Sequence, residues 1–103
     1  MTIADLGWTR QKQEIEKGDY WFDGTLLVTK SVSDLLTQIE MMMLLTDAYG
    51  FAYDSKGIDY LLVYTHPTKG KLFFIDQVTR ESLRAGDHPK EHHYATLMLA
   101  SEY

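Results

Sequence analysis

VSDLLTQIEMMMLLTDAY, residues 32–49, is the stretch that decides the fold of this chain. Its apolar side chains recur at steps of three and four, which is the period of one face of a helix. Ser31 or Ser33 is suited to cap the first turn, with the acid Asp34 near the positive helix end, and Gly50 is suited to end the run. The stretch therefore predicts one long amphipathic helix over about 32–49. The recurring positions are Val32, Leu35, Leu36, Ile39, Met42, Met43 and Thr46.

Two β-hairpins are predicted, one before and one after this helix in the sequence. The first covers about 19–29, DYWFDGTLLVT, where Asp23-Gly24 offers the two positive-φ positions of a type I′ turn. The second covers about 58–78, where two runs rich in β-branched and aromatic residues flank the connector 67–70. Each pattern is typical of two antiparallel strands joined by a short turn.

The remaining segments complete an α+β fold in a single domain over 1–103. The polar run 9–17 predicts a helix ending at Gly18, and 79–85 predicts a short helix. The tail 91–103 fits either a helix or a strand, and we expect a strand because it would add to the sheet. The result is a mostly antiparallel sheet with the long helix packed on one face. The expected core consists of Trp21, Leu27, Leu35, Leu36, Ile39, Leu62, Phe73 and Ile75.

The composition excludes several classes of function. Fifteen acids against ten bases give a net charge of −5, which disfavours binding to nucleic acid or to an anionic membrane. The absence of cysteine removes disulfides and thiolate chemistry. The first residues lack a basic and apolar leader, and no apolar run approaches the roughly 18 residues of a membrane span. We expect a cytoplasmic protein without a cofactor.

One cluster has the residue types of a metal site. Residues 87–93 contain an aspartate, a glutamate and three histidines, and His88 and His92 have the i,i+4 spacing of a helical metal pair. The order differs from the HExxH motif, in which a glutamate follows the first histidine directly. A polar loop entering the last element explains the same residues, so we expect no catalytic residue and keep His88 and His92 as weak metal candidates.

Charge is unevenly distributed along the chain. Residues 31–55 carry four acids and no base, whereas 56–90 carry six bases and four acids. Glu40 and Asp47 are seven residues apart, so they share one stripe of the predicted helix, expected on the outside opposite Ile39 and Met43. Such a stripe could steer a basic partner, although an ordinary solvated helix face would look the same.

Aromatic residues follow the predicted helix. Tyr49, Phe51 and Tyr53 alternate in a connector that also contains Asp54, and tyrosines surrounded by charge are typical of binding hot spots. The rings could instead close the core, an alternative that fits Phe51 best. The triple methionine 41–43 is similarly compatible with a soft core or with a binding surface.

These features predict a small acidic, non-catalytic binding protein that inhibits a basic, nucleic-acid-processing effector by protein–protein contact. Immunity proteins, antitoxins and phage anti-defence proteins such as anti-CRISPRs are of this physical type. A monomer or homodimer is expected. The alternatives are a small metal-dependent enzyme that uses residues 87–93 and a homo-oligomeric accessory protein. The residues expected to contact the partner are Asp23, Glu40, Asp47, Tyr49, Tyr53 and Asp54.

Overall fold

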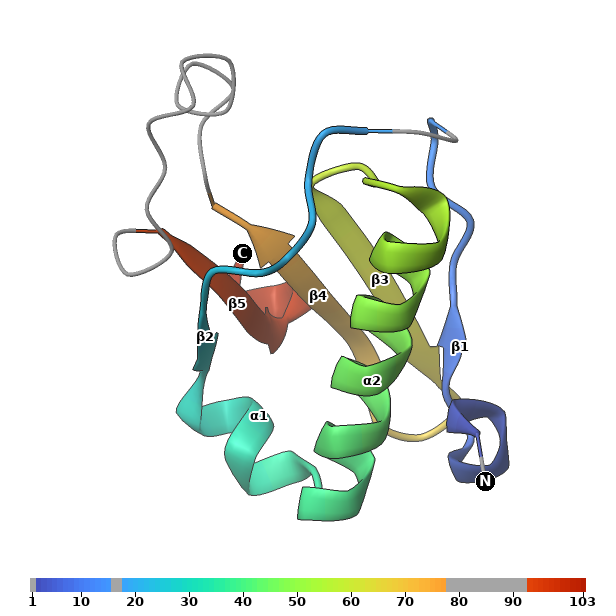
Figure 1. The fold of residues 1–103 in the computed structure, drawn as a ribbon. Coiled ribbons are helices and arrows are strands. Elements are labelled where there is room, and N and C mark those ends of the chain that lie inside the picture. Colours follow the sequence, from blue (N-terminus) through green and yellow to red (C-terminus); the bar gives the residue numbers. More distant parts are fainter. Residues whose placement is uncertain (1, 16–17, 78–92) are drawn as a thin grey trace.

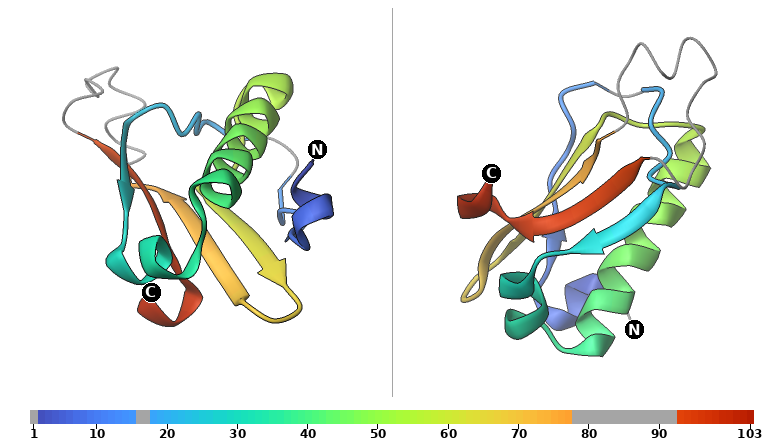
Figure 2. Two further views of the ribbon diagram at one scale, coloured as in Figure 1. Left: turned by 90° about the horizontal axis from the view of Figure 1, so that it is seen from below. Right: turned by 90° about the vertical axis from the view of Figure 1, so that its left-hand side faces the viewer.

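A five-stranded sheet forms the centre of the protein, and a long helix covers one of its faces (Figures 1 and 2). The computed structural model describes residues 2–15, 18–77 and 93–103. The strand order is β1-β3-β4-β5-β2, so β1 and β2 are the two edges. The strands are β1 (Thr9–Arg10), β2 (Thr25–Val28), β3 (Leu61–His66), β4 (Gly70–Asp76) and β5 (Tyr94–Leu99). The helices are α1 (Lys30–Leu35) and α2 (Gln38–Ser55), with short 3-10 turns at Ile3–Leu6 and Ala100–Glu102.

The second predicted hairpin is present as β3 and β4. The two strands pair antiparallel from Leu61↔Ile75 to His66↔Gly70, and Gly70 takes a positive φ of 89° at the turn. The strand expected in the tail is also confirmed, because β5 pairs antiparallel with β4. The α+β class and the mostly antiparallel sheet were therefore predicted correctly.

The first predicted hairpin is wrong. β2 pairs with β5 in parallel, and Tyr20 forms an isolated bridge with Ile58. Phe22 takes the positive φ, 57°, and is fully buried beside Phe74 at a ring distance of 4.9 Å. Burial of these aromatic rings in the core outweighs the local turn preference of Asp23-Gly24.

Gly24 serves a close approach between two strands. A Cβ at this position would lie 2.3 Å from the His93 ring and 2.8 Å from the His93 carbonyl oxygen. The backbone of residue 25 then donates to that carbonyl at 3.0 Å, which begins the β2–β5 ladder. A glycine is required at position 24 because a larger residue would prevent this close approach of the two strands.

The predicted single helix over 32–49 is divided in two. Leu36 is extended (φ −102°, ψ 148°), and Thr37 caps α2 by accepting from the Glu40 backbone at 3.1 Å. Glu40 Oε1 accepts in return from the Thr37 backbone at 3.2 Å, which completes a capping box. The helix also continues through Gly50 to Ser55 and ends where Lys56 is left-handed.

The helix predicted over 9–17 is wrong in the part that the structure describes, and the one predicted over 79–85 lies outside that part. Trp8 is buried at 1% exposure, and β1 pairs with β3 immediately after it. The chain then continues along β3, where the Gln11 backbone donates to the Val63 carbonyl at 2.8 Å. Anchoring by Trp8 prevails over the weak helical preference of a polar run.

The core lies between α2 and the covered face of the sheet. Of the residues expected there, Leu36, Leu62 and Ile75 are buried and Phe73 is partly exposed. Trp21, Leu27, Leu35 and Ile39 are exposed, which contradicts the prediction. The largest fully buried side chains are Trp8, Phe22, Val32, Leu44, Ile58, Leu62, Tyr64, Leu72, Phe74 and Leu97.

Candidate functional site

Glu40 lies on the inner side of α2, although it was expected on the outside. Its side chain is buried and accepts from Trp8 Nε1 at 3.0 Å. Lys69, in the β3–β4 turn, donates to both carboxylate oxygens at 2.6 and 2.7 Å. Burial alone would raise the pKa of Glu40, but hydrogen bonds from Lys69, Trp8 and Thr37 outweigh it and lower the pKa to about 2. Glu40 is therefore a structural anion.

Asp47 also turns toward the sheet and is only partly exposed. It accepts from Arg10 Nη1 at 2.6 Å and from the Tyr64 hydroxyl at 2.8 Å. The Arg10 guanidinium stacks over the Phe51 ring at 3.9 Å. Burial and the neighbouring Asp47 carboxylate raise the pKa of Tyr64. The expected acidic outer stripe is thus wrong, because bases on β1 and on the β3–β4 turn draw both acids inward.

The outer side of α2 is apolar instead. Ile39, Met42, Tyr49 and Tyr53 are exposed at 59%, 67%, 38% and 76%. Ile39 and Met42 are three residues apart, Met42 and Tyr49 seven, and Tyr49 and Tyr53 four, so all four lie along one side of the helix. We call this line the outer stripe of α2; it comprises Ile39, Met42, Thr46, Tyr49, Gly50 and Tyr53.

The inner side of α2 explains why the outer stripe is exposed. Glu40, Leu44, Ala48 and Ala52, each four residues apart, are the buried positions of the helix and pack toward the sheet. The outer stripe occupies the opposite side, and no described element crosses in front of α2 in Figure 1. A helix with apolar side chains on both sides is usual where both sides are covered. In the part of the chain that the structure describes, only the inner side of α2 is covered.

Gly50 interrupts this stripe with a gap. A Cβ at Gly50 would meet nothing within 4 Å, so packing within the described protein does not require a glycine. Glycine inside a helix costs roughly 0.5–1 kcal/mol relative to alanine. Because the described residues give no packing reason for this cost, Gly50 is suited to the close approach of another molecule.

The remaining expected contact residues separate into two groups. Tyr53 and Asp54 are exposed at the end of α2, and Tyr49 is exposed at its outer edge with its ring 6.3 Å from Phe74. Burial of part of this side chain raises the pKa of Tyr49. Asp23 is exposed in the segment before β2, outside α2. The structure therefore brings together three of the six predicted contact residues.

Two members of the site, Ile39 and Met42, were not among the predicted contact residues, although the triple methionine 41–43 had been considered as a binding surface. Ile39 was assigned to the core because the helix was taken to begin near residue 32. The sequence contains a signal that corrects this, since Thr37-x-x-Glu40 is a capping box and sets the start of α2.

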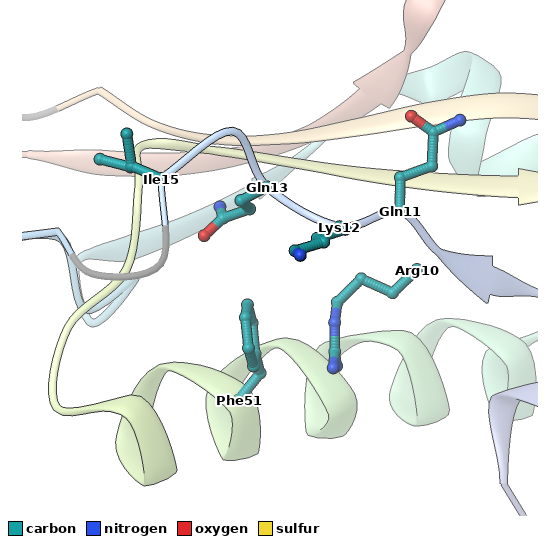
Figure 3. A pocket seen from close by; sticks show the side chains of 6 residues that line it. All are labelled: Arg10, Gln11, Lys12, Gln13, Ile15 and Phe51. Atoms are coloured by element: carbon teal, nitrogen blue, oxygen red, sulfur yellow. The ribbon is translucent and has the colours of Figure 1, made fainter.

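A cleft of about 360 Å³ lies between residues 10–15 and α2 (Figure 3). Its lining includes two cations, of which Arg10 is already bound to Asp47. The Gln13 carboxamide is also engaged, because it donates to the carbonyls of residues 59 and 61 at 3.2 and 2.7 Å. Two of the four polar side chains that line the cleft, Arg10 and Gln13, are thus engaged within the protein, and the outer stripe of α2 is the stronger candidate. The lining residues are Arg10, Gln11, Lys12, Gln13, Ile15 and Phe51.

The weak metal candidates His88 and His92 lie outside the described residues. Within residues 2–15, 18–77 and 93–103, no three histidine or acidic side chains are grouped as a metal site would require. Over the same residues, no helix combines the length and the apolar character that a membrane span needs.

Comparisons with known proteins add no relative. No protein-family model matches the chain. No curated protein and no solved structure matches it. The function is therefore argued from the geometry alone.

Proposed function

We propose that this chain is a small acidic, non-catalytic binding protein that inhibits a basic, nucleic-acid-processing effector through the outer stripe of α2. The observation that carries the proposal is the exposed apolar and aromatic line on this helix, which no described element covers. Immunity proteins, antitoxins and anti-CRISPR proteins are the corresponding functional types.

The chemistry of the stripe favours a protein partner. Tyr53, at 76% exposure, and Met42, at 67%, provide side chains that gain most from being removed from water against another protein. Tyrosine is enriched among residues that dominate binding energy, and methionine adapts to irregular surfaces. A tyrosine in the centre of an interface is commonly worth about 2 kcal/mol or more.

Charge supports a basic partner. The net charge is −5, and residues 31–55 contain no lysine or arginine. The ion pairs Glu40–Lys69 and Asp47–Arg10 neutralise two acids of α2 inside the protein, but Asp54 is exposed beside Tyr53. A carboxylate at the end of an apolar stripe, on a chain with a net charge of −5, favours association with a positively charged surface and disfavours nucleic acid. The contact would thus compete with the effector's substrate.

The test is affinity capture with matched variants. The tagged wild-type chain, a Met42→Glu/Tyr53→Glu variant and a Tyr103→Glu control are each exposed to a lysate of the source cells. Tyr103 is a suitable control because its exposure, 73%, is close to that of Tyr53 and it lies outside α2. We expect the wild type and the control to retain one basic nuclease or nucleic-acid-binding protein at near equimolar ratio.

The proposal also requires inhibition. Addition of one equivalent of the wild-type chain should suppress the captured effector's activity on nucleic acid, and the double variant should not. Retention of the same partner by the double variant would contradict the assigned face. A partner that does not process nucleic acid would contradict the assigned function.

A further inference from the structure

The outer stripe of α2 is symmetric about Thr46. Ile39 and Tyr53 lie seven residues before and after it, and Met42 and Gly50 lie four before and after it. Two such helices packed antiparallel with their Thr46 residues facing each other would place Ile39 against Tyr53 and Met42 against Gly50. The long side chain of Met42 on each helix would then lie against the space left by Gly50 on the other helix, once in each half of the contact.

The ends of the stripe also match. Met43, which is partly exposed, and Tyr49 lie three residues before and after Thr46, on the two flanks of the contact. Asp54 would lie opposite Gln38 at the N-terminus of the other helix, where the helix dipole favours a negative charge. The two Asp54 carboxylates would lie at opposite ends of the contact. No like charges meet along the stripe.

We propose that two copies of this chain associate through the outer stripe of α2, antiparallel and about a two-fold axis at Thr46. A two-fold contact uses the same patch on both copies, and therefore requires the self-complementary pattern just described. The proposal goes beyond the proposed function, because it depends on the geometry of the stripe and not on the effector. It implies that the effector must displace the second copy to reach the same face.

The area available predicts a weak dimer. A fully buried large side chain contributes roughly 150–250 Å². The four apolar side chains of the stripe are 38–76% exposed, so together they offer on the order of 450 Å² per copy. The total of roughly 900 Å² is at the low end for specific complexes. We expect a Kd on the order of 10–100 µM, which places free monomer in exchange with dimer.

Disulfide trapping tests the arrangement directly, because the chain contains no native cysteine. The variants Thr46→Cys, Ile39→Cys and Tyr53→Cys are oxidised separately and in an equal mixture of the last two. Helices packed at about 8–10 Å bring facing Cα atoms within reach of a disulfide. Ser101→Cys, an exposed position outside α2, is the control for random collisions.

The proposal predicts a specific set of products. Thr46→Cys should cross-link to itself, and Ile39→Cys should cross-link to Tyr53→Cys in the mixture several times faster than either forms its own dimer. Self-cross-linking of all three variants at similar rates would indicate a parallel pair and overturn the proposal. Rates no faster than that of Ser101→Cys would overturn it as well.

Sedimentation equilibrium provides the second measurement. Gly50→Leu fills the gap that Met42 requires, so it should raise Kd at least tenfold while far-UV circular dichroism stays unchanged, because leucine favours the helix. Ser101→Leu, the matched control, should leave Kd unchanged. A wild-type monomer at millimolar concentration would refute the proposal. Failure to find any effector would leave all of these results as they are, so the two proposals fail separately.

Discussion

Replacement of Lys69 by methionine should destabilise the protein by an amount that depends on pH. The lysine donates to both oxygens of the buried Glu40 carboxylate, and methionine keeps the aliphatic length without the charge. The pKa of Glu40 is about 2 in the folded protein against an ordinary 4.5. At about 1.4 kcal/mol per pKa unit, this difference corresponds to about 3 kcal/mol of stability.

Lys69 contributes only part of this stabilisation of the Glu40 carboxylate. Trp8 and Thr37 also hold the carboxylate, and the lysine side chain is 29% exposed to screening by water. We therefore expect Lys69→Met to lower the free energy of unfolding by about 2 kcal/mol at pH 7. Because the folded pKa is depressed, the stabilisation is complete above about pH 4.5 and disappears as the pH falls toward 2. At the acid end, wild type and variant should converge.

The assay is urea unfolding followed by tryptophan fluorescence between pH 2 and 7. Lys71→Met, an exposed lysine on β4, is the control and should change stability by less than about 0.5 kcal/mol. The double variant Glu40→Gln/Lys69→Met should regain part of the loss because no unpaired charge stays buried. Equal destabilisation by Lys69→Met at pH 2.5 and at pH 7 would refute the reasoning.

Three further substitutions test the local structure. Gly50→Ala should raise the free energy of unfolding by roughly 0.5–1 kcal/mol, since the added methyl meets no atom of the described residues within 4 Å; a loss of stability in urea unfolding would show that the position is constrained. Gly24→Ala should lower the melting temperature by several degrees, since its methyl would lie 2.3 Å from the His93 ring; an unchanged melting temperature would show that β2 and β5 are not held this closely. Thr37→Ala should cost about 1 kcal/mol and fray the first turn of α2, as hydrogen exchange at the Glu40 amide would report; unchanged protection there would argue against the cap.

Local patterns predicted those parts of the fold that depend on neighbours in sequence. Alternation and the turn at 67–70 identified the β3–β4 hairpin, and alternation in the tail identified β5. The parallel pairing of β2 with β5 could not be predicted in this way, because Asp23-Gly24 is a strong turn signal and the competing partner is remote. Long-range burial of Phe22 decided between them.

The candidate site shows a related limit. A seven-residue spacing states that Glu40 and Asp47 share a side of the helix, but it does not state which side. The side is set by the ion pairs with Lys69 and Arg10, and the positions of these two bases depend on the sheet. Tyr53 and Asp54 were predicted from the aromatic and acidic residues of an expected connector after the helix, which the structure shows to be part of α2, and Ile39 was missed with the helix start.

The position of β5 in the sheet has a consequence for protein synthesis. β5 lies between β4 and β2, so β2 has no neighbour in the sheet until residues 94–99 have left the ribosome. The β3–β4 hairpin and α2 can form earlier, because their contacts are local or already translated. During that interval the exposed Leu26 and Leu27 of an unpaired strand are available to other nascent chains. Slowed translation before residue 94 would lengthen this vulnerable period, whereas rapid completion of β5 would end it.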